Sequence, residues 1–277
     1  MAATHGTDSD KIFAGSIPKL YEEFLVPLIF EPYAEDLANR VASGTPGRVL
    51  EIAAGTGVVT RRLASALPRG VSIVATDLNQ SMLDMASAVG TSRPVTWRQA
   101  DAMALPFEDA AFDAVVCQFG AMFFPDKPRA FSEARRVLKA GGVLLFNVWD
   151  RIEENDFAEV VTTALESLFP ADPPRFLART PHGYFDHATV LRDLRGGGFV
   201  SPPRVHTLAA RSRAASPRIP AIAYCQGTPL RNEIEARDGS RLDEATDRAA
   251  DAIARVFGAG PVDGKIQAHV FVVEFAG

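Results

Sequence analysis

Two carboxylates and a turn of small residues are the groups in this chain whose spacing best suits binding chemistry. Glu51 lies in an apolar, strand-like run (Arg48–Ile52), and the turn Ala53–Gly57 follows it at once. Asp77 ends the next such run, Val71–Asp77. Glycine lets a backbone bend sharply and approach a ligand, and an acid at the end of the second strand of a βαβ unit can accept hydrogen bonds from ribose hydroxyls. The pattern predicts a nucleoside-containing cofactor across the strand ends.

The charge at Glu51 distinguishes two classes of such cofactor. A dinucleotide site uses G-x-G-x-x-G, whose third glycine packs the helix against the strand, whereas this chain has Thr60 at that position. A carboxylate at Glu51 would repel a pyrophosphate, but it would attract the cationic amino-acid part of S-adenosylmethionine. The residues therefore favour the sulfonium cofactor over NAD or NADP.

The composition argues against several other classes of function. The chain has 277 residues, a formal net charge of −5 and two cysteines, which fits one large α/β protein with insertions. A net acidic chain without a dense basic run is a poor candidate for binding nucleic acid. Met1–Lys11 lacks an apolar signal segment and no run approaches membrane-spanning length, so we expect a cytoplasmic protein without stable membrane insertion.

Strand-like and helix-like segments alternate through the first half of the chain. This alternation predicts a mostly parallel sheet with right-handed crossovers. The expected further elements are a helix over about 56–67, a helix after Asn79, strands at Val95–Asp101 and Ala111–Phe119, a helix from Pro128 that Gly141 and Gly142 end, and a strand at Val143–Trp149.

The regular alternation of strand-like and helix-like segments ends at about Asp150, and longer helical segments separate the remaining strands. We expect helices at Asn155–Phe169 and His187–Arg195, a strand at Val205–Ala210, a helical stretch over about 217–257 that is interrupted near Gly239, and a final strand at His269–Phe275. Strands that bracket a helical insertion predict a cap over the carboxyl edge of the sheet.

Five short motifs carry a family resemblance, namely Glu51–Gly57, Thr76–Asn79, Gln99–Ala102, Phe112–Asp113 and Leu138–Gly142. On these motifs the chain resembles the class I S-adenosylmethionine-dependent methyltransferases, and within them the bacterial ubiquinone and menaquinone biosynthesis C-methyltransferases. The resemblance covers about residues 13–149 and implies a Rossmann-like, mostly parallel seven-stranded sheet with helices on both faces and an antiparallel last strand. It implies an N-terminal helical segment (1–45) covering the cofactor site, a cofactor-binding core (46–150), and remaining strands with helical cap insertions (151–277).

The same resemblance implies a role for each residue of the cofactor site. The methionine end would be held by Glu51, Ala53, Ala54, Gly55, Thr56 and Gly57, and lined by Gln118, Phe119 and Gly120. The ribose would be held by Asp77, and the adenine by Leu78, Met82, Asp101, Ala102 and Met103, while Tyr21 would close the site. Ala53 departs from the family, which usually has a glycine there.

Structural roles compete with several of these assignments. Asp77 could cap the following helix, and Asp101 could be a turn residue before Pro106. Met82 and Met103 more often fill a core than touch a cofactor, and Phe119 could be part of a hydrophobic plug. The sequence leaves these alternatives open.

Methyl transfer is an in-line displacement that depends mainly on positioning, and it needs a base only when the nucleophile carries a proton of high pKa. The sequence does not identify a catalytic residue; the weak candidates for a base are His182, Tyr184, His187 and Asp126. We find no metal motif, because the spacing of His182, Asp186 and His187 does not match a zinc site.

The sequence thus predicts an S-adenosylmethionine-dependent methyltransferase acting on a small, apolar or aromatic organic acceptor and releasing S-adenosylhomocysteine. Two alternatives remain, namely a protein that binds S-adenosylmethionine without transferring its methyl group and a nicotinamide-dependent oxidoreductase. A homodimer is plausible for an enzyme of this size, although no motif marks an interface.

Overall fold

The computed structural model describes residues 8–277 and divides them into two compact units. The sheet unit comprises Pro32–Val148, Tyr184–Leu208 and Ala268–Gly277. The helical unit comprises residues 8–31, Trp149–Gly183 and Ala209–Gln267. The first seven residues of the N-terminal segment expected at 1–45 lie outside the described part. Within residues 8–277, no helix is both long and apolar enough to cross a membrane.

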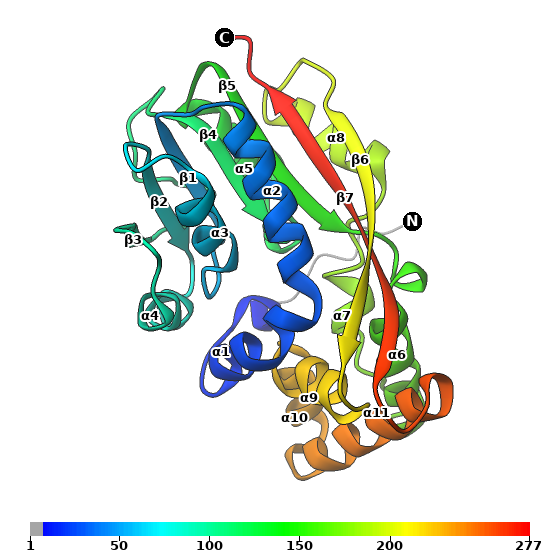
Figure 1. The fold of residues 1–277 in the computed structure, drawn as a ribbon. Coiled ribbons are helices and arrows are strands. Elements are labelled where there is room, and N and C mark those ends of the chain that lie inside the picture. Colours follow the sequence, from blue (N-terminus) through cyan, green and yellow to red (C-terminus); the bar gives the residue numbers. More distant parts are fainter. Residues whose placement is uncertain (1–7) are drawn as a thin grey trace. The chain divides into compact units, whose positions relative to one another are not determined.

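A seven-stranded sheet has the order β3-β2-β1-β4-β5-β7-β6 (Figure 1). Strands β3, β2, β1, β4 and β5 pair in parallel. Strand β7 runs antiparallel to β5, since Gly141 bonds to Phe275 at one end and Asp150 bonds to Gln267 at the other. The strands are β1 (Arg48–Ile52), β2 (Ser72–Asp77), β3 (Thr96–Gln99), β4 (Phe112–Gln118), β5 (Leu138–Trp149), β6 (Arg204–Ala214) and β7 (Val262–Glu274).

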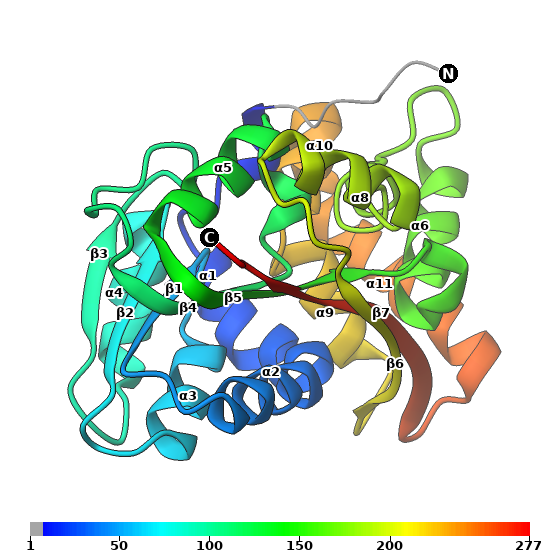
Figure 2. The same ribbon diagram turned by 90° about the horizontal axis from the view of Figure 1, so that it is seen from above.

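The strand order reverses between β1 and β4, and in an open α/β sheet ligands bind at the carboxyl ends of the strands beside such a reversal. Helices α2 and α3 lie on one face of the sheet unit, and α5 and α8 lie on the other (Figure 2). The predicted fold is therefore confirmed. The helices of this unit are α2 (Glu31–Ser43), α3 (Val58–Ala66), α4 (Gln80–Val89), α5 (Lys127–Val137) and α8 (His187–Gly196), with a short 3-10 turn at Ala121–Phe123.

Helix α5 ends earlier than the sequence suggested. We expected Gly141 and Gly142 to end it, but it stops at Val137 and β5 begins at Leu138. The two glycines instead lie within β5, next to an irregularity in its register with β4. A Cβ at Gly142 would come within 2.8 Å of the Lys139 carbonyl oxygen, so the glycine permits a bend inside the strand rather than a helix end.

The helical unit contains the segments inserted between the last three strands. The expected stretch over 217–257 is interrupted at Gly239 as predicted and also at Gly227–Pro229, so that it forms three helices. Its elements are α1 (Ile17–Leu20), a π-helix (Tyr21–Phe30), α6 (Asp156–Leu168), α7 (Phe176–Arg179), α9 (Arg218–Gln226), α10 (Leu230–Asp238) and α11 (Leu242–Phe257), with 3-10 turns at Asp8–Lys11, Ile152–Glu154 and Gly239–Arg241.

A buried ion triad ties distant segments of the helical unit together. Arg179 contacts Asp10 at 2.7 Å and Glu233 at 2.5 Å, and Thr180 donates a hydrogen bond to Asp10. Only 2% of the Asp10 side chain is exposed. Because a buried charge is costly unless it is paired, these residues depend on one another.

Candidate functional site

The turn after β1 lies at the carboxyl edge of the sheet. Gly57 donates to the Ala54 carbonyl, and Ala54 donates to Thr76 of β2, which fixes the turn beside the start of α3. Ala53, Gly55 and Gly57 have φ angles of 55°, 56° and 84°. A Cβ at Gly57 would lie 2.9 Å from the Trp97 ring. Only glycine fits there, and the turn keeps its backbone N–H groups close to the surface that a ligand would use.

Glu51 is buried beneath this turn and accepts a hydrogen bond of 2.5 Å from the Thr60 hydroxyl. Burial raises its pKa to about 8, more than the Thr60 bond lowers it. The side chain is therefore largely protonated at neutral pH, and a nearby cation would favour its carboxylate form. Thr60, which stands where the dinucleotide motif has its third glycine, is thus the hydrogen-bond partner of Glu51.

Asp77 joins the turn to the next helix. Its Oδ2 accepts from the Gly55 N–H and its Oδ1 from the Asn79 N–H, both at 2.8 Å. Burial raises the pKa of this carboxyl, and the two backbone bonds oppose that rise. Asn79, not Asp77, occupies the N-cap of α4. Asp77 therefore supports the start of α4 through the Asn79 N–H and, at the same time, links the end of β2 to the turn after β1.

The residues expected around an adenine ring differ in exposure. Leu78 is 47% exposed beside Asp77, whereas Met82 is buried in α4. Asp101 accepts from the Met103 N–H at 2.8 Å, which is a turn interaction, while Ala102 is buried. An exposed leucine beside the candidate ribose acid is available to a flat ring. Met82 is buried, in agreement with the core-filling role that the sequence also allowed for it.

The end of β4 meets the turn after β1. Phe119 has a φ of 50°, unusual for a residue with a side chain, and its N–H donates to Oδ1 of Asn147 at 2.9 Å. A Cβ at Gly120 would come within 2.5 Å of the Ala53 Cβ. Gln118 pairs in register with Asn147 on β5. The structure thus places the segment 118–120 beside the turn after β1, through the close approach of Gly120 to Ala53.

Asn147 was missed by sequence reasoning. The available signal was a single amide within the apolar run Val143–Trp149, a place where a polar side chain needs a partner.

Tyr21 belongs to a row of rings inside the helical unit. Its ring stacks on Phe30 at 5.1 Å between centroids and meets Phe13 edge-on at 6.0 Å. Phe30 contacts Trp149 at 6.1 Å, and Trp149 contacts His182 at 5.9 Å. We call these five residues the aromatic row. Phe13 and Tyr21 are half-buried and the other three are buried, so the row leads from a partly open end to a buried imidazole.

His182 has a tautomer fixed by its partner. Its Nδ1 lies 2.8 Å from the Asp150 carbonyl oxygen. Because a carbonyl can only accept, Nδ1 carries the proton and Nε2 of the neutral ring keeps its lone pair. Burial lowers the pKa of His182 to about 4, so the ring is neutral at pH 7.

The other three candidate bases have structural partners in the sheet unit. Tyr184 donates to Asp193 at 3.0 Å, and burial raises its pKa, so the phenol retains its proton. Asp126 caps α5 by accepting from the Arg129 N–H. His187 packs edge-on against His269 with centroids 4.2 Å apart. For His182, the bond to the Asp150 carbonyl oxygen leaves Nε2 with its lone pair.

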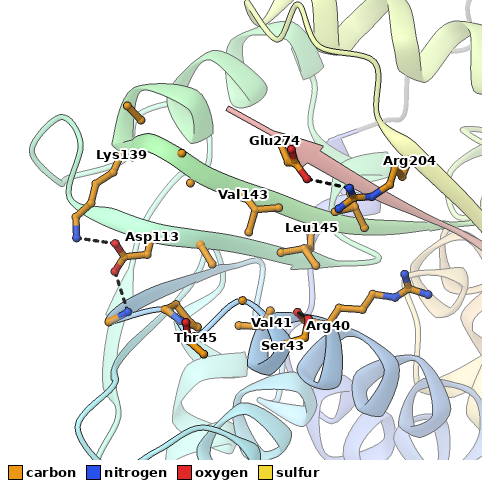
Figure 3. A pocket seen from close by; sticks show the side chains of 18 residues that line it. Arg40, Val41, Ser43, Thr45, Asp113, Lys139, Val143, Leu145, Arg204 and Glu274 are labelled. Atoms are coloured by element: carbon orange, nitrogen blue, oxygen red, sulfur yellow. Dashed lines mark hydrogen bonds and ion pairs between the residues drawn. The ribbon is translucent and has the colours of Figure 1, made fainter. Parts of the chain in front are cut away.

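A groove of about 500 Å³ lies at the opposite, amino edge of the sheet unit (Figure 3). Val143 and Leu145 form its apolar floor, between the ion pairs Lys139–Asp113 and Arg204–Glu274. Asp113 also accepts from the N–H groups of Gly47 and Arg48. These charges are paired, and none of the candidate cofactor residues lines the groove. Among the described residues, no cluster of histidine, cysteine or carboxylate side chains could hold a metal ion.

Comparisons with known proteins agree with this arrangement. Residues 50–146 match a family model described as a methyltransferase domain. The ubiquinone/menaquinone biosynthesis C-methyltransferase UbiE of Ectopseudomonas mendocina is 32% identical over 201 residues, which cover 68% of this chain and 74% of that protein. The match includes the turn and the acids described above.

Two solved structures share the fold. A putative methyltransferase from Bacillus halodurans superposes with a TM-score of 0.56 at 20% identity, covering 88% of this chain and 99% of that one. Phospholethanolamine N-methyltransferase 2 of Haemonchus contortus, in complex with phosphomonomethylethanolamine and S-adenosylhomocysteine, gives 0.57 at 17% identity, covering 99% of this chain and 61% of that one. These two structures share the fold, and the similarity to UbiE shows that the chain belongs to the class I S-adenosylmethionine-dependent methyltransferases.

Proposed function

We propose that this S-adenosylmethionine-dependent methyltransferase acts on a small acceptor with an apolar, aromatic body. The observation that carries the proposal is the aromatic row, in which the rings of Tyr21, Phe30 and Trp149 follow one another to the neutral imidazole of His182. Flat rings pack well against such side chains. The similarity to UbiE, a ubiquinone/menaquinone biosynthesis C-methyltransferase, supports an acceptor of this kind.

The residues at the carboxyl edge fit the cofactor. We assign Glu51, the Ala53–Gly57 turn and the segment 118–120 to its methionine end, Asp77 to the ribose, and Leu78 with 101–103 to the adenine. A buried carboxyl whose pKa is about 8 suits a cationic ligand, because the cation and the ionised carboxylate stabilise each other. Thr56 supports the assignment, since its buried hydroxyl has no hydrogen-bond partner among the described residues and could bond to a ligand in this turn.

We also propose that different ranges of the chain bind the cofactor and the acceptor, as the sequence suggested. Residues 46–150 bind the cofactor, and the helical insertions within residues 151–277 receive the acceptor. Met82 and Met103 are retained as apolar neighbours of the adenine.

His182 is our proposed base for an acceptor whose nucleophile carries a proton. Its Nε2 would take that proton while the acceptor forms the new bond to carbon. The bound cofactor supplies a methyl group on a sulfonium, and the electron pair of the broken carbon–sulfur bond stays on sulfur. Burial lowers the pKa of His182 to about 4, so its Nε2 is unprotonated at pH 7. A positioned general base contributes about 10²–10⁴-fold to a rate, most when its pKa lies near the operating pH.

The test is a panel of acceptors incubated with the purified protein and S-adenosylmethionine, with S-adenosylhomocysteine measured as the common product. We expect methylation of hydroxylated aromatic compounds, and weaker turnover after Trp149→Ala. Phe257→Ala, a change to an aromatic residue of the helical unit outside the row, is the control. Turnover of only small, polar amines would contradict the proposed acceptor class, and cofactor binding without turnover on any acceptor would contradict the proposed reaction.

A further inference from the structure

Asn147 is a buried amide in an otherwise apolar strand. It lies in β5 between Phe146 and Val148, and all three residues are fully buried. Asparagine is depleted in strands, and burying an amide costs free energy unless it forms hydrogen bonds. Its place in β5 therefore requires a specific partner.

That partner is the backbone of Phe119. The Phe119 N–H lies 2.9 Å from Oδ1 of Asn147 and 3.3 Å from its carbonyl oxygen. Because an N–H can only donate, the amide oxygen must face Phe119, which fixes the orientation of the side chain. The amide nitrogen has no hydrogen-bond partner among the described residues, so the bond to Phe119 is the interaction that accounts for this side chain.

Phe119 is in a conformation that needs support. Its φ of 50° places it in the left-handed region, which costs a residue with a side chain about 1–2 kcal/mol. Asn147 holds its backbone, while the Tyr33 ring packs edge-on against its ring with centroids 5.2 Å apart. Tyr33 is fully buried. A backbone bond and a packed ring together oppose the return of Phe119 to the ordinary φ region.

The conformation of Phe119 determines where Gly120 lies. Gly120 is so close to the turn after β1 that an added Cβ would meet the Ala53 Cβ at 2.5 Å and Cys117 Sγ at 2.7 Å. Ala53 is itself left-handed, with a φ of 55°. If the segment 118–120 relaxed, Gly120 would move against or away from Ala53, and the turn would change shape.

We infer that Asn147 is a positioning residue that holds the segment 118–120, and through Gly120 the turn at Ala53, in the shape that binds the methionine end of the cofactor. The inference rests on the proposed cofactor site. Asn147 acts through the Phe119 backbone and is not assigned a contact with the reacting atoms.

The test compares three variants by calorimetric titration with S-adenosylmethionine and S-adenosylhomocysteine, alongside thermal melting. Asn147→Leu has a similar volume but no acceptor, Asn147→Asp keeps an oxygen for Phe119, and Val148→Ala removes packing from the next residue, which faces the other side of the strand. We expect Asn147→Leu to weaken both ligands at least tenfold, or about 1.4 kcal/mol. We expect Asn147→Asp to recover most of that loss and Val148→Ala to leave both affinities nearly unchanged despite a lower Tm.

Wild-type affinity in the Asn147→Leu variant, or an equal loss of affinity in Val148→Ala, would overturn the inference. If wild type itself bound neither ligand, the proposed cofactor site would fail instead, so the two failures are distinguishable. A double-mutant cycle with Phe119→Gly gives a second, independent measurement. Glycine adopts a positive φ without support, so Asn147→Leu should weaken binding less in that background. An equal loss in both backgrounds would contradict the role.

Discussion

The carboxyl edge of the sheet unit and the polar groups of the helical unit are built in different ways. At the sheet edge, residues close in sequence form the turn after β1, in which Ala53 is left-handed, and the left-handed Phe119 at the end of β4 adjoins this turn through Gly120. In the helical unit, the important groups are held by partners far apart in the chain, such as Asp10 with Arg179 and Asp150 with His182. We infer from this difference that the proposed cofactor site depends mainly on the backbone shape of one βαβ unit and the strand end beside it, whereas the proposed acceptor chemistry depends on contacts between segments far apart in the chain.

The largest predicted effect is a loss of stability when the long-range ion contacts of the helical unit are removed. Arg179→Ala removes a cation that contacts both buried carboxylates, Asp10 and Glu233, although Glu233 keeps a 3.8 Å contact with Arg237. Loss of one member of a buried pair costs about 3–5 kcal/mol. We expect a large fall in Tm by scanning calorimetry. Arg211→Ala removes an exposed pair with Asp263 and should cost less than about 1 kcal/mol. Similar losses in the two variants would show that the triad does not hold the helical unit together.

His182→Asn tests the chemistry assigned to the helical unit. The asparagine amide can still donate to the Asp150 carbonyl, but it lacks the Nε2 lone pair. We expect kcat to fall about 100-fold with little change in cofactor affinity. In wild type, kcat/KM should fall as the pH drops through about 4, where His182 becomes protonated.

His187→Asn is the matched control for that variant, since His187 lies at the start of α8 and packs against His269. Equal losses in kcat for the two variants would argue against His182 as the base.

Glu51→Gln tests the role of the Glu51 carboxyl at the sheet edge, because its effects on unfolding stability and on cofactor affinity can be measured separately. The pKa of Glu51 is about 8 in the folded protein, against an ordinary value of 4.5 for a solvated glutamate. The contribution of protonated Glu51 to the free energy of unfolding is therefore fully present below about pH 4.5. It is lost as the pH rises through about 8, by up to about 1.4 kcal/mol per pH unit.

In denaturant titrations of the cofactor-free protein, the stability of Glu51→Gln relative to wild type should rise between pH 5 and pH 8. Its affinity for S-adenosylmethionine should fall about tenfold or more at pH 8, because the carboxylate is absent. A stability difference that does not change with pH would mean that Glu51 is ionised throughout.

Ala53→Gly should have the smallest effect of these substitutions, and it should raise the unfolding free energy where Arg179→Ala lowers it. Ala53 has a φ of 55°, so glycine relieves strain there, and we expect a gain of up to about 1 kcal/mol in unfolding free energy. Ala54→Gly is the control, because Ala54 is buried and does not have a positive φ; it should lose stability. A loss at both positions would show that the turn is not strained at Ala53.

The sequence predicted the sheet and the turn because their signals are local: Glu51, the two glycines and Asp77 follow one another within one βαβ unit. Asn147 was not predicted, since its partner Phe119 lies 28 positions earlier and no local pattern joins them. The row that ends at His182 also depends on contacts between distant segments. The end of α5 was misplaced because glycines that usually end helices here permit a bend inside β5.

The most direct test of the central claim is calorimetric titration of wild type and Asp77→Ala with S-adenosylmethionine and S-adenosylhomocysteine, using NAD and NADP as controls. We predict that wild type binds the first pair and neither nicotinamide cofactor. Asp77→Ala should weaken that binding about 100-fold, as expected for losing charged hydrogen bonds to the ribose. Unchanged affinity in Asp77→Ala, or binding of the nicotinamide cofactors alone, would contradict the account of the sheet edge.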